Sequence, residues 1–146
     1  MNSAALYRLR DRIFIHPWQK TTAGLGIASE PYVSLPLDSH EIGSAVLAAL
    51  AQSGRTVPHP TSWKGQDAAL LKAAGARSQR AFQSGSRYVY VERDGRTLRL
   101  EPSRNGGTKG DEKGFHPLPE LAASLPLDSS AEAIGAALRA ALDLSR

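Results

Sequence analysis

The chain has 146 residues, a formal net charge of +4, and 41% hydrophobic and 22% charged residues. This length and composition are typical of one globular domain and exclude a wholly disordered chain. Cysteine is absent, which excludes disulfides, thiolate nucleophiles and cysteine-ligated zinc. No apolar run approaches the roughly 20 residues that span a membrane, and the N-terminus lacks the pattern of a secretion signal, so we expect a cytoplasmic location and no membrane partner.

The chain begins with a predicted hairpin. Residues 6–10 and 12–16 alternate apolar and polar side chains, as strands with one buried face do. Pro17 is expected to end the second strand because proline has no N–H to donate, and residues 21–26 are then predicted to form a loop. A short strand over residues 32–35 follows.

A repeated motif comes next. Residues 34–39 have the sequence Ser-Leu-Pro-Leu-Asp-Ser, which recurs unchanged at 124–129, and each copy precedes a helix rich in alanine and leucine. The motif supplies an N-cap to each helix: Asp38 or Ser39 in the first copy, and Asp128, Ser129 or Ser130 in the second. Each helix has one apolar face and one internal glycine, Gly43 or Gly135, which predicts a close approach of the helix to the sheet.

A connector follows, and the second half then repeats the pattern of the first half. A short helix is predicted from Asp67 to about Ala74, and a strand is predicted to begin at Phe82. Residues 87–92 and 97–101 form a second hairpin around Asp-Gly, with Tyr88 and Tyr90 on one face and Val89 and Val91 on the other. Pro102 is expected to stop this hairpin, a glycine-rich loop covers 105–114, and the last helix runs from about 130 to 144.

These elements predict a single α+β domain made of two similar halves, about residues 4–55 and 78–146. A connector with a short helix joins the halves. The sheet is expected to be mainly antiparallel and to be covered by the two related helices and a shorter third helix.

The sequence offers no set of residues for catalysis. The histidines His16, His40, His59 and His116 lie far apart, and no metalloprotease, nucleophile-elbow or phosphate-loop motif is present. His16 and Glu101 occupy matching places in the two halves and are interpreted as polar residues at strand ends. We therefore expect no enzyme, no metal and no cofactor.

Positive charge is concentrated in the second half of the chain. Residues 77–109 contain eight basic and three acidic side chains. Such a stripe, with Tyr88 and Tyr90 able to stack on bases, is compatible with a small nucleic-acid-binding module. It is equally compatible with an acidic protein partner, or with the solvated outer face of a sheet.

Two tryptophans, Trp18 and Trp63, lie in predicted loops beside Lys20 and Lys64. An aromatic ring next to a cation can anchor a partner protein. Loop tryptophans can equally close the edge of a core.

Several segments of the second half resemble the immunity proteins of contact-dependent growth inhibition systems, the CdiI family. They are Arg-Ser-Gln-Arg-Ala-Phe at 77–82, Tyr-Val-Tyr-Val at 88–91, the segment 98–105, and the Ile-Gly helix that ends in Ser145. The resemblance implies a cytoplasmic protein that binds the C-terminal toxin domain of a cognate CdiA protein, often a nuclease, and has no catalysis of its own. The positive net charge makes mimicry of nucleic-acid phosphates doubtful, and nucleic acid is not the expected partner. The toxin-binding residues expected on this basis are loop residues with anchoring side chains: Trp18, Lys20, Trp63, Lys64, Arg104, Lys109 and Lys113.

Overall fold

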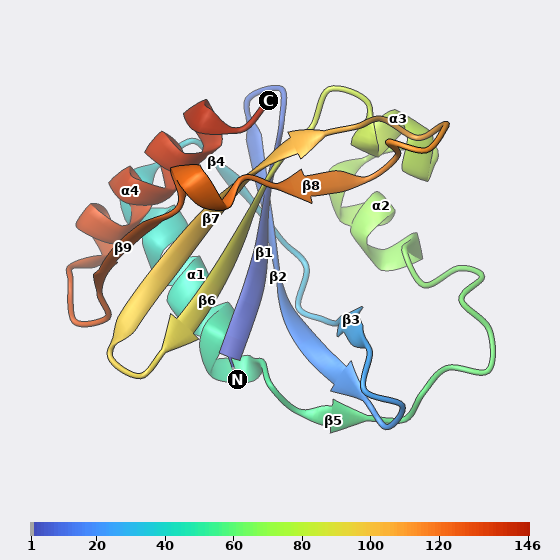
Figure 1. The fold of residues 1–146 in the computed structure, drawn as a ribbon, viewed down its shortest axis with the longest axis horizontal. Helices are drawn as coiled ribbons and strands as arrows, with labels where there is room; N and C mark the ends of the chain where they lie inside the picture. Colours follow the sequence, from blue (N-terminus) through green and yellow to red (C-terminus); the bar gives the residue numbers. More distant parts are fainter. Residues whose placement is uncertain (1) are drawn as a thin grey trace.

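The computed structural model describes residues 2–146 as an α+β fold, the class that the sequence predicts, and the fold is built on a nine-stranded sheet (Figure 1). The strands are β1 (Asn2–Leu9), β2 (Arg12–Thr21), β3 (Gly26–Ala28), β4 (Val33–Pro36), β5 (Thr56–Val57), β6 (Arg87–Asp94), β7 (Thr97–Asn105), β8 (Phe115–Pro117) and β9 (Ala123–Pro126). The helices are α1 (Ser39–Gln52), α2 (Ala68–Ala74), α3 (Gln79–Gln83) and α4 (Ala131–Leu144), with one 3-10 turn at Pro119–Leu121. No helix within residues 2–146 is long and apolar enough to cross a membrane.

The sheet is centred on the pairing of β1 with β6. Its main strand order is β3-β2-β1-β6-β7-β8, and all pairs are antiparallel except β2 with the short β5. β4 pairs with the first part of β2, and β9 pairs with the first part of β7. The elements β1-β2-β4-α1 and β6-β7-β9-α4 thus occur in the same order with the same pairings.

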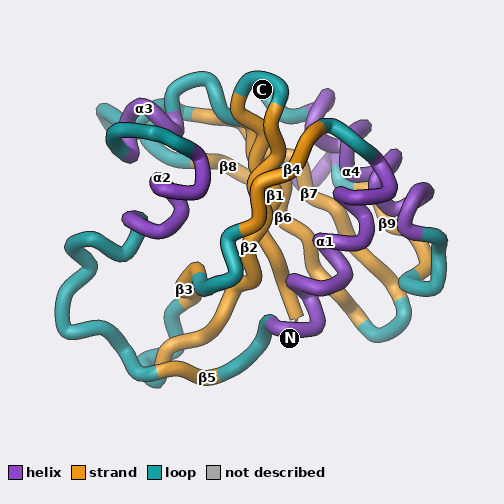
Figure 2. The backbone as a smooth tube through the Cα atoms, turned by 180° about the vertical axis from the view of Figure 1, so that it is seen from behind, coloured by secondary structure: helices purple, strands orange, loops and turns teal. Residues whose placement is uncertain are grey.

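The main core lies between the sheet and the pair α1 and α4 (Figure 2). The strands contribute alternate apolar side chains, among them Leu6, Ile15 and Val91, all of which are buried. The apolar helix positions meet them, and all eight that the spacing predicts are buried: Ile42, Val46, Ala49, Leu50, Ile134, Leu138, Ala141 and Leu142. The predicted amphipathic helices are therefore confirmed.

The first long helix begins at a cap within the repeated motif, and the second begins at a cap directly after it. The Asp38 carboxylate accepts a hydrogen bond from the Glu41 N–H at 2.9 Å. For α4 the capping residue is Ser130, directly after the second copy, and its hydroxyl accepts from the Ala133 N–H at 3.1 Å. Each cap satisfies one of the amides left free in the first turn of a helix.

Removing a cap should weaken the fold measurably. We expect Ser130→Ala to lower the free energy of unfolding by about 1 kcal/mol, because it leaves a first-turn amide without its acceptor. Urea denaturation followed by circular dichroism would measure the change. Ser129→Ala is the matched control, since the Ser129 hydroxyl makes no hydrogen bond to any of residues 2–146. An equal loss in both variants would contradict the assignment of the cap.

The helix glycines serve a different purpose from the predicted one. A Cβ atom built on Gly43 would lie 1.9 Å from the carbonyl oxygen of Ala131, and one built on Gly135 would lie 1.6 Å from that of Ser39. Each glycine therefore admits the backbone at the start of the other helix. The close approach is between α1 and α4, not between a helix and the sheet.

Both prolines that were expected to end strands lie inside them. Pro17 stands within β2, which continues to Thr21 because it gains β3 and β5 as new neighbours beyond the reach of β1. Pro102 stands within β7, which continues to Asn105 and pairs there with β8. Phe82, expected to begin a strand, lies in α3 instead, where Ser78 caps the helix.

Candidate functional site

The candidate site lies on the side of the sheet turned away from α1 and α4. We call this side the aromatic face, and it is formed by the side chains of Tyr7, Phe14, His16, Trp18, Tyr88 and Tyr90. They alternate with the core residues along β1, β2 and β6, and the strand register places them side by side: Tyr7 is opposite both Phe14 and Tyr88, and Ala5 is opposite both His16 and Tyr90.

Only part of the aromatic face is covered by helices. Leu70 of α2 and Phe82 of α3 pack on Tyr7 and Phe14, with the Tyr7 and Phe82 ring centroids 5.1 Å apart. Tyr7 also lies 4.9 Å from Tyr88, so the covered part is a continuous cluster of rings. Figures 1 and 2 show α2 and α3 toward one end of the sheet, with no helix over the region next to β3 and β5.

The uncovered part contains a groove of about 510 Å³. Its lining residues come from β1, β2, β6 and the loops around β3 and β5: Ser3, Trp18, Gln19, Lys20, Gly24, Gly26, Gly54, Thr56, Tyr88 and Tyr90. A smaller cavity of about 220 Å³ adjoins it under α2, lined by residues that include Tyr7, His16, Trp18, Tyr32 and Trp63. Trp18 and Gly26 line both spaces, so the groove and the cavity share a border.

His16 is a buried titratable group of the cavity whose pKa is strongly lowered. Its side chain is 0% exposed, and its Nδ1 lies 2.9 Å from the carbonyl oxygen of Pro17. Burial lowers the pKa of His16 to about 4, against the opposing effect of the Pro17 hydrogen bond. The ring is therefore neutral at pH 7, and Nδ1 carries the hydrogen because a carbonyl can only accept. Its Nε2 has no partner within residues 2–146 and stays an unused acceptor.

The remaining polar atoms make the floor of the site uncharged and its rim charged. Burial raises the pKa of Tyr7 and of Tyr88, so both phenols are neutral at any physiological pH. Charges lie beside the floor: Lys20 is exposed, and Glu101, which is opposite Tyr90 in the β6–β7 pair, pairs with Arg99 at 2.6 Å. An apolar floor with a charged rim is the usual anatomy of a protein-binding surface. No group of three or more His, Asp or Glu within residues 2–146 could hold a metal ion.

Three of the residues predicted to bind the partner come together here. Trp18 and Lys20 lie on β2, not in a loop as expected, and both line the groove. Trp63 lies in the loop before α2, is 48% exposed, and packs edge-on against His59 with ring centroids 5.6 Å apart. It lines the smaller cavity together with Trp18, so the two tryptophans border one site.

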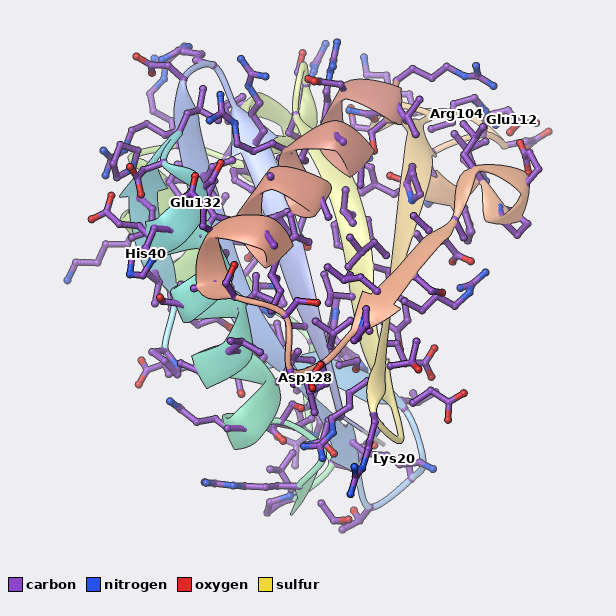
Figure 3. The ribbon with its side chains drawn as sticks, turned by 90° about the vertical axis from the view of Figure 1, so that its left-hand side faces the viewer. Lys20, His40, Arg104, Glu112, Asp128 and Glu132 are labelled. Carbon is purple, nitrogen blue, oxygen red and sulfur yellow. The ribbon has the colours of Figure 1, made fainter. Side chains whose placement is uncertain are left out.

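The other four predicted residues line neither the groove nor the smaller cavity. Lys64 is exposed next to Trp63 but lines neither space. Arg104 lies on β7, not in a loop, and pairs with Glu112 at 2.8 Å, which lowers the pKa of that carboxyl. Lys109 and Lys113 are exposed on the loop between β7 and β8. Figure 3 shows Lys20 and Arg104 at opposite ends of the molecule.

Tyr7, His16 and Tyr90 belong to the site but were not predicted as toxin-binding residues. The sequence pattern that could have identified this face is the spacing of Phe14, His16 and Trp18, which places three rings on one face of one strand. It was hidden by the expectation that Pro17 ends the strand, which separated Trp18 from the other two residues.

The fold and the site define an α+β protein that presents a half-covered aromatic surface suited to binding. The sequence matches the family model described as "CdiI: CDI immunity protein" over residues 2–145, and the chain belongs to this family. A search of curated protein sequences gives no match.

Two solved structures share the fold. A protein of unknown function from Neisseria meningitidis, NMB0488, aligns with a TM-score of 0.76 and 26% identity, covering 99% of this chain and 95% of that one. A chain of a CdiA-CT/CdiI toxin and immunity complex from Yersinia pseudotuberculosis aligns with a TM-score of 0.69 and 18% identity, covering 99% and 97%. The resemblance inferred from sequence is thus confirmed at the level of the family.

Proposed function

We propose that this protein neutralises the C-terminal toxin domain of a cognate CdiA protein by binding it through the uncovered part of the aromatic face. The observation that carries the proposal is the groove of about 510 Å³, in which Trp18 and Tyr90 form an apolar wall and Lys20 a charged rim. Aromatic residues and a neighbouring cation are the side chains that most often dominate the energy of a protein interface. The structural likeness to a chain of a toxin and immunity complex supports the same function.

We expect the toxin to be a nuclease, as the family resemblance implies. The net charge of +4 argues against an inhibitor that imitates nucleic acid. Binding through the aromatic face requires no such imitation, because its floor is uncharged. The alternative function, a nucleic-acid-binding module, is weakened by the packing of Tyr88 against Tyr7 and Phe115, which occupies part of the ring that would stack on a base.

Co-expression with the C-terminal domain of the cognate CdiA protein tests the function. Rescue of growth and co-purification of a stoichiometric complex are expected. Continued killing without a complex would overturn the immunity function for that pair. A titration with single-stranded RNA and DNA at increasing salt separates the alternative, since binding to phosphates weakens steeply with salt.

A pair of charge reversals tests the proposed surface. Lys20→Glu should weaken toxin binding by about tenfold or more, because it replaces a positive charge at the rim of the interface by a negative one. Lys113→Glu makes the same change of charge on the loop between β7 and β8 and should leave affinity unchanged. Surface plasmon resonance with the immobilised toxin domain gives both values. Equal effects, or an effect of Lys113→Glu alone, would exclude the aromatic face as the binding surface while leaving the immunity function intact.

A further inference from the structure

Three arginines line a hollow at the end of the sheet where β1 turns into β2. The hollow has a volume of about 240 Å³ and is lined by Arg8, Arg10, Arg87 and Gly85. Figure 1 shows this turn at the opposite end of the sheet from β5, and therefore far from the mouth of the groove beside Lys20. The hollow is thus a separate feature of the molecule.

The strand register forces two of these arginines together. Arg8 and Arg87 are directly opposite each other in the β1–β6 pair, and like charges in that position destabilise a sheet. Both side chains are nevertheless held in place. The Arg8 Nε–H donates to the carbonyl oxygen of Arg10 at 3.0 Å, and an Arg87 Nη1–H donates to that of Leu142, near the C-terminus of α4, at 3.2 Å.

The positive charge of the hollow is poorly compensated. Arg8 lies 3.9 Å from the carboxylate of Asp143, whose side chain is 72% exposed, so this pair contributes little. Within residues 2–146, Arg10 and Arg87 have no ion pair, and the Arg10 guanidinium has no hydrogen bond. Three guanidinium groups with one loose carboxylate leave an excess of about two positive charges.

We propose that the hollow is a binding site for a dianionic phosphate group, either inorganic phosphate or a phosphomonoester. Its two negative charges match the excess, whereas a phosphodiester or a single carboxylate carries only one. Guanidinium forks bind phosphate oxygens in pairs, and most of the N–H groups of these arginines are unused. Gly85 borders open space, since nothing lies within 4 Å of the position where its Cβ would be.

Titrations followed by NMR of the full-length protein test the site. The probes are inorganic phosphate, AMP and dimethyl phosphate, a diester with one charge. Saturable shifts of the Gly85 amide and the Arg10 side-chain N–H are expected with the first two probes. Dimethyl phosphate should bind about tenfold more weakly, since it loses at least one charge-assisted contact. Equal affinity for phosphate and AMP would identify the phosphate alone as the ligand, and tighter binding of AMP would add a nucleoside contact to the same site.

Variants distinguish a built site from general positive charge. Arg10→Gln should weaken phosphate binding by about tenfold, and Arg87→Lys should do so although it keeps the charge, because the fork is lost. Arg55→Gln is the control: it removes the same charge as Arg10→Gln from an exposed residue next to β5. Linear shifts without saturation, equal binding of dimethyl phosphate, or equal losses in Arg10→Gln and Arg55→Gln would each overturn the proposal.

Discussion

Replacing Gly135 by alanine should lower the free energy of unfolding by about 2 to 3 kcal/mol, although alanine favours a helix by about 1 kcal/mol over glycine. The reason is steric. The added methyl would lie 1.6 Å from the Ser39 carbonyl oxygen, and this contact is with backbone, which cannot rotate away. To accept the methyl group, α1 and α4 must move apart, which loosens the packing of both helices against the core. Urea denaturation followed by tryptophan fluorescence and circular dichroism would give the difference.

The partner glycine supplies an internal check. Gly43→Ala should destabilise in the same way, but the double variant should lose less than the sum of both, because helices already separated accept the second methyl more easily. Gly26→Ala is the control, since nothing lies within 4 Å of its Cβ position. A Gly135→Ala protein as stable as the wild type would contradict the close contact between the helices.

The second large effect expected is a loss of stability in mild acid that depends on His16. Its pKa is about 4 in the folded protein, against 6.5 for an ordinary histidine. Between these values the unfolded chain binds a proton that the folded chain does not. The contribution of neutral His16 to the free energy of unfolding is therefore fully present above pH 6.5 and is lost as the pH is lowered toward 4. Each pH unit in this range is worth about 1.4 kcal/mol, which gives a loss of about 3 kcal/mol at pH 4.

His16→Gln isolates this contribution, because glutamine cannot bind the proton. The free energy of unfolding of wild type and variant should be measured from pH 7.5 to pH 4. The wild type should lose about 3 kcal/mol more than the variant, whatever the stability of the variant at pH 7, and titrations of carboxylates cancel in the comparison. His40→Gln, at an exposed residue of α1, should follow the wild-type curve. Parallel curves for wild type and His16→Gln would show that His16 is not held neutral by burial.

The parts of the fold that follow from local chemistry could be predicted from the sequence. The caps at Asp38 and Ser130, the apolar faces of α1 and α4, and the separation of Val89 and Val91 from Tyr88 and Tyr90 all depend on short-range spacing. The errors at Pro17 and Pro102 have one cause. A proline removes a single donor, and whether a strand continues past it depends on neighbours such as β3 and β8, which come from distant parts of the chain.

The candidate site was predictable only in part for the same reason. Trp18, Lys20 and Trp63 were identified from the chemistry of their side chains, but their meeting at one site depends on the loop before α2 folding back over the sheet. Arg104 was expected to be a loop residue, free for a partner. In the structure β7 extends through it, and its charge is paired with Glu112.

The central pairing of β1 with β6 also determines when the protein can act. During translation β1 and β2 are made early, but the partner for the other edge of β1 arrives only with Arg87–Asp94. Pairing between strands so far apart in sequence forms slowly, and until then a nascent chain exposes an open strand edge that can pair with other chains. Tyr88 and Tyr90 belong to that late strand, so a ribosome that has made only the first half has made no groove. Protection of a cell would therefore depend on molecules completed before the toxin arrives.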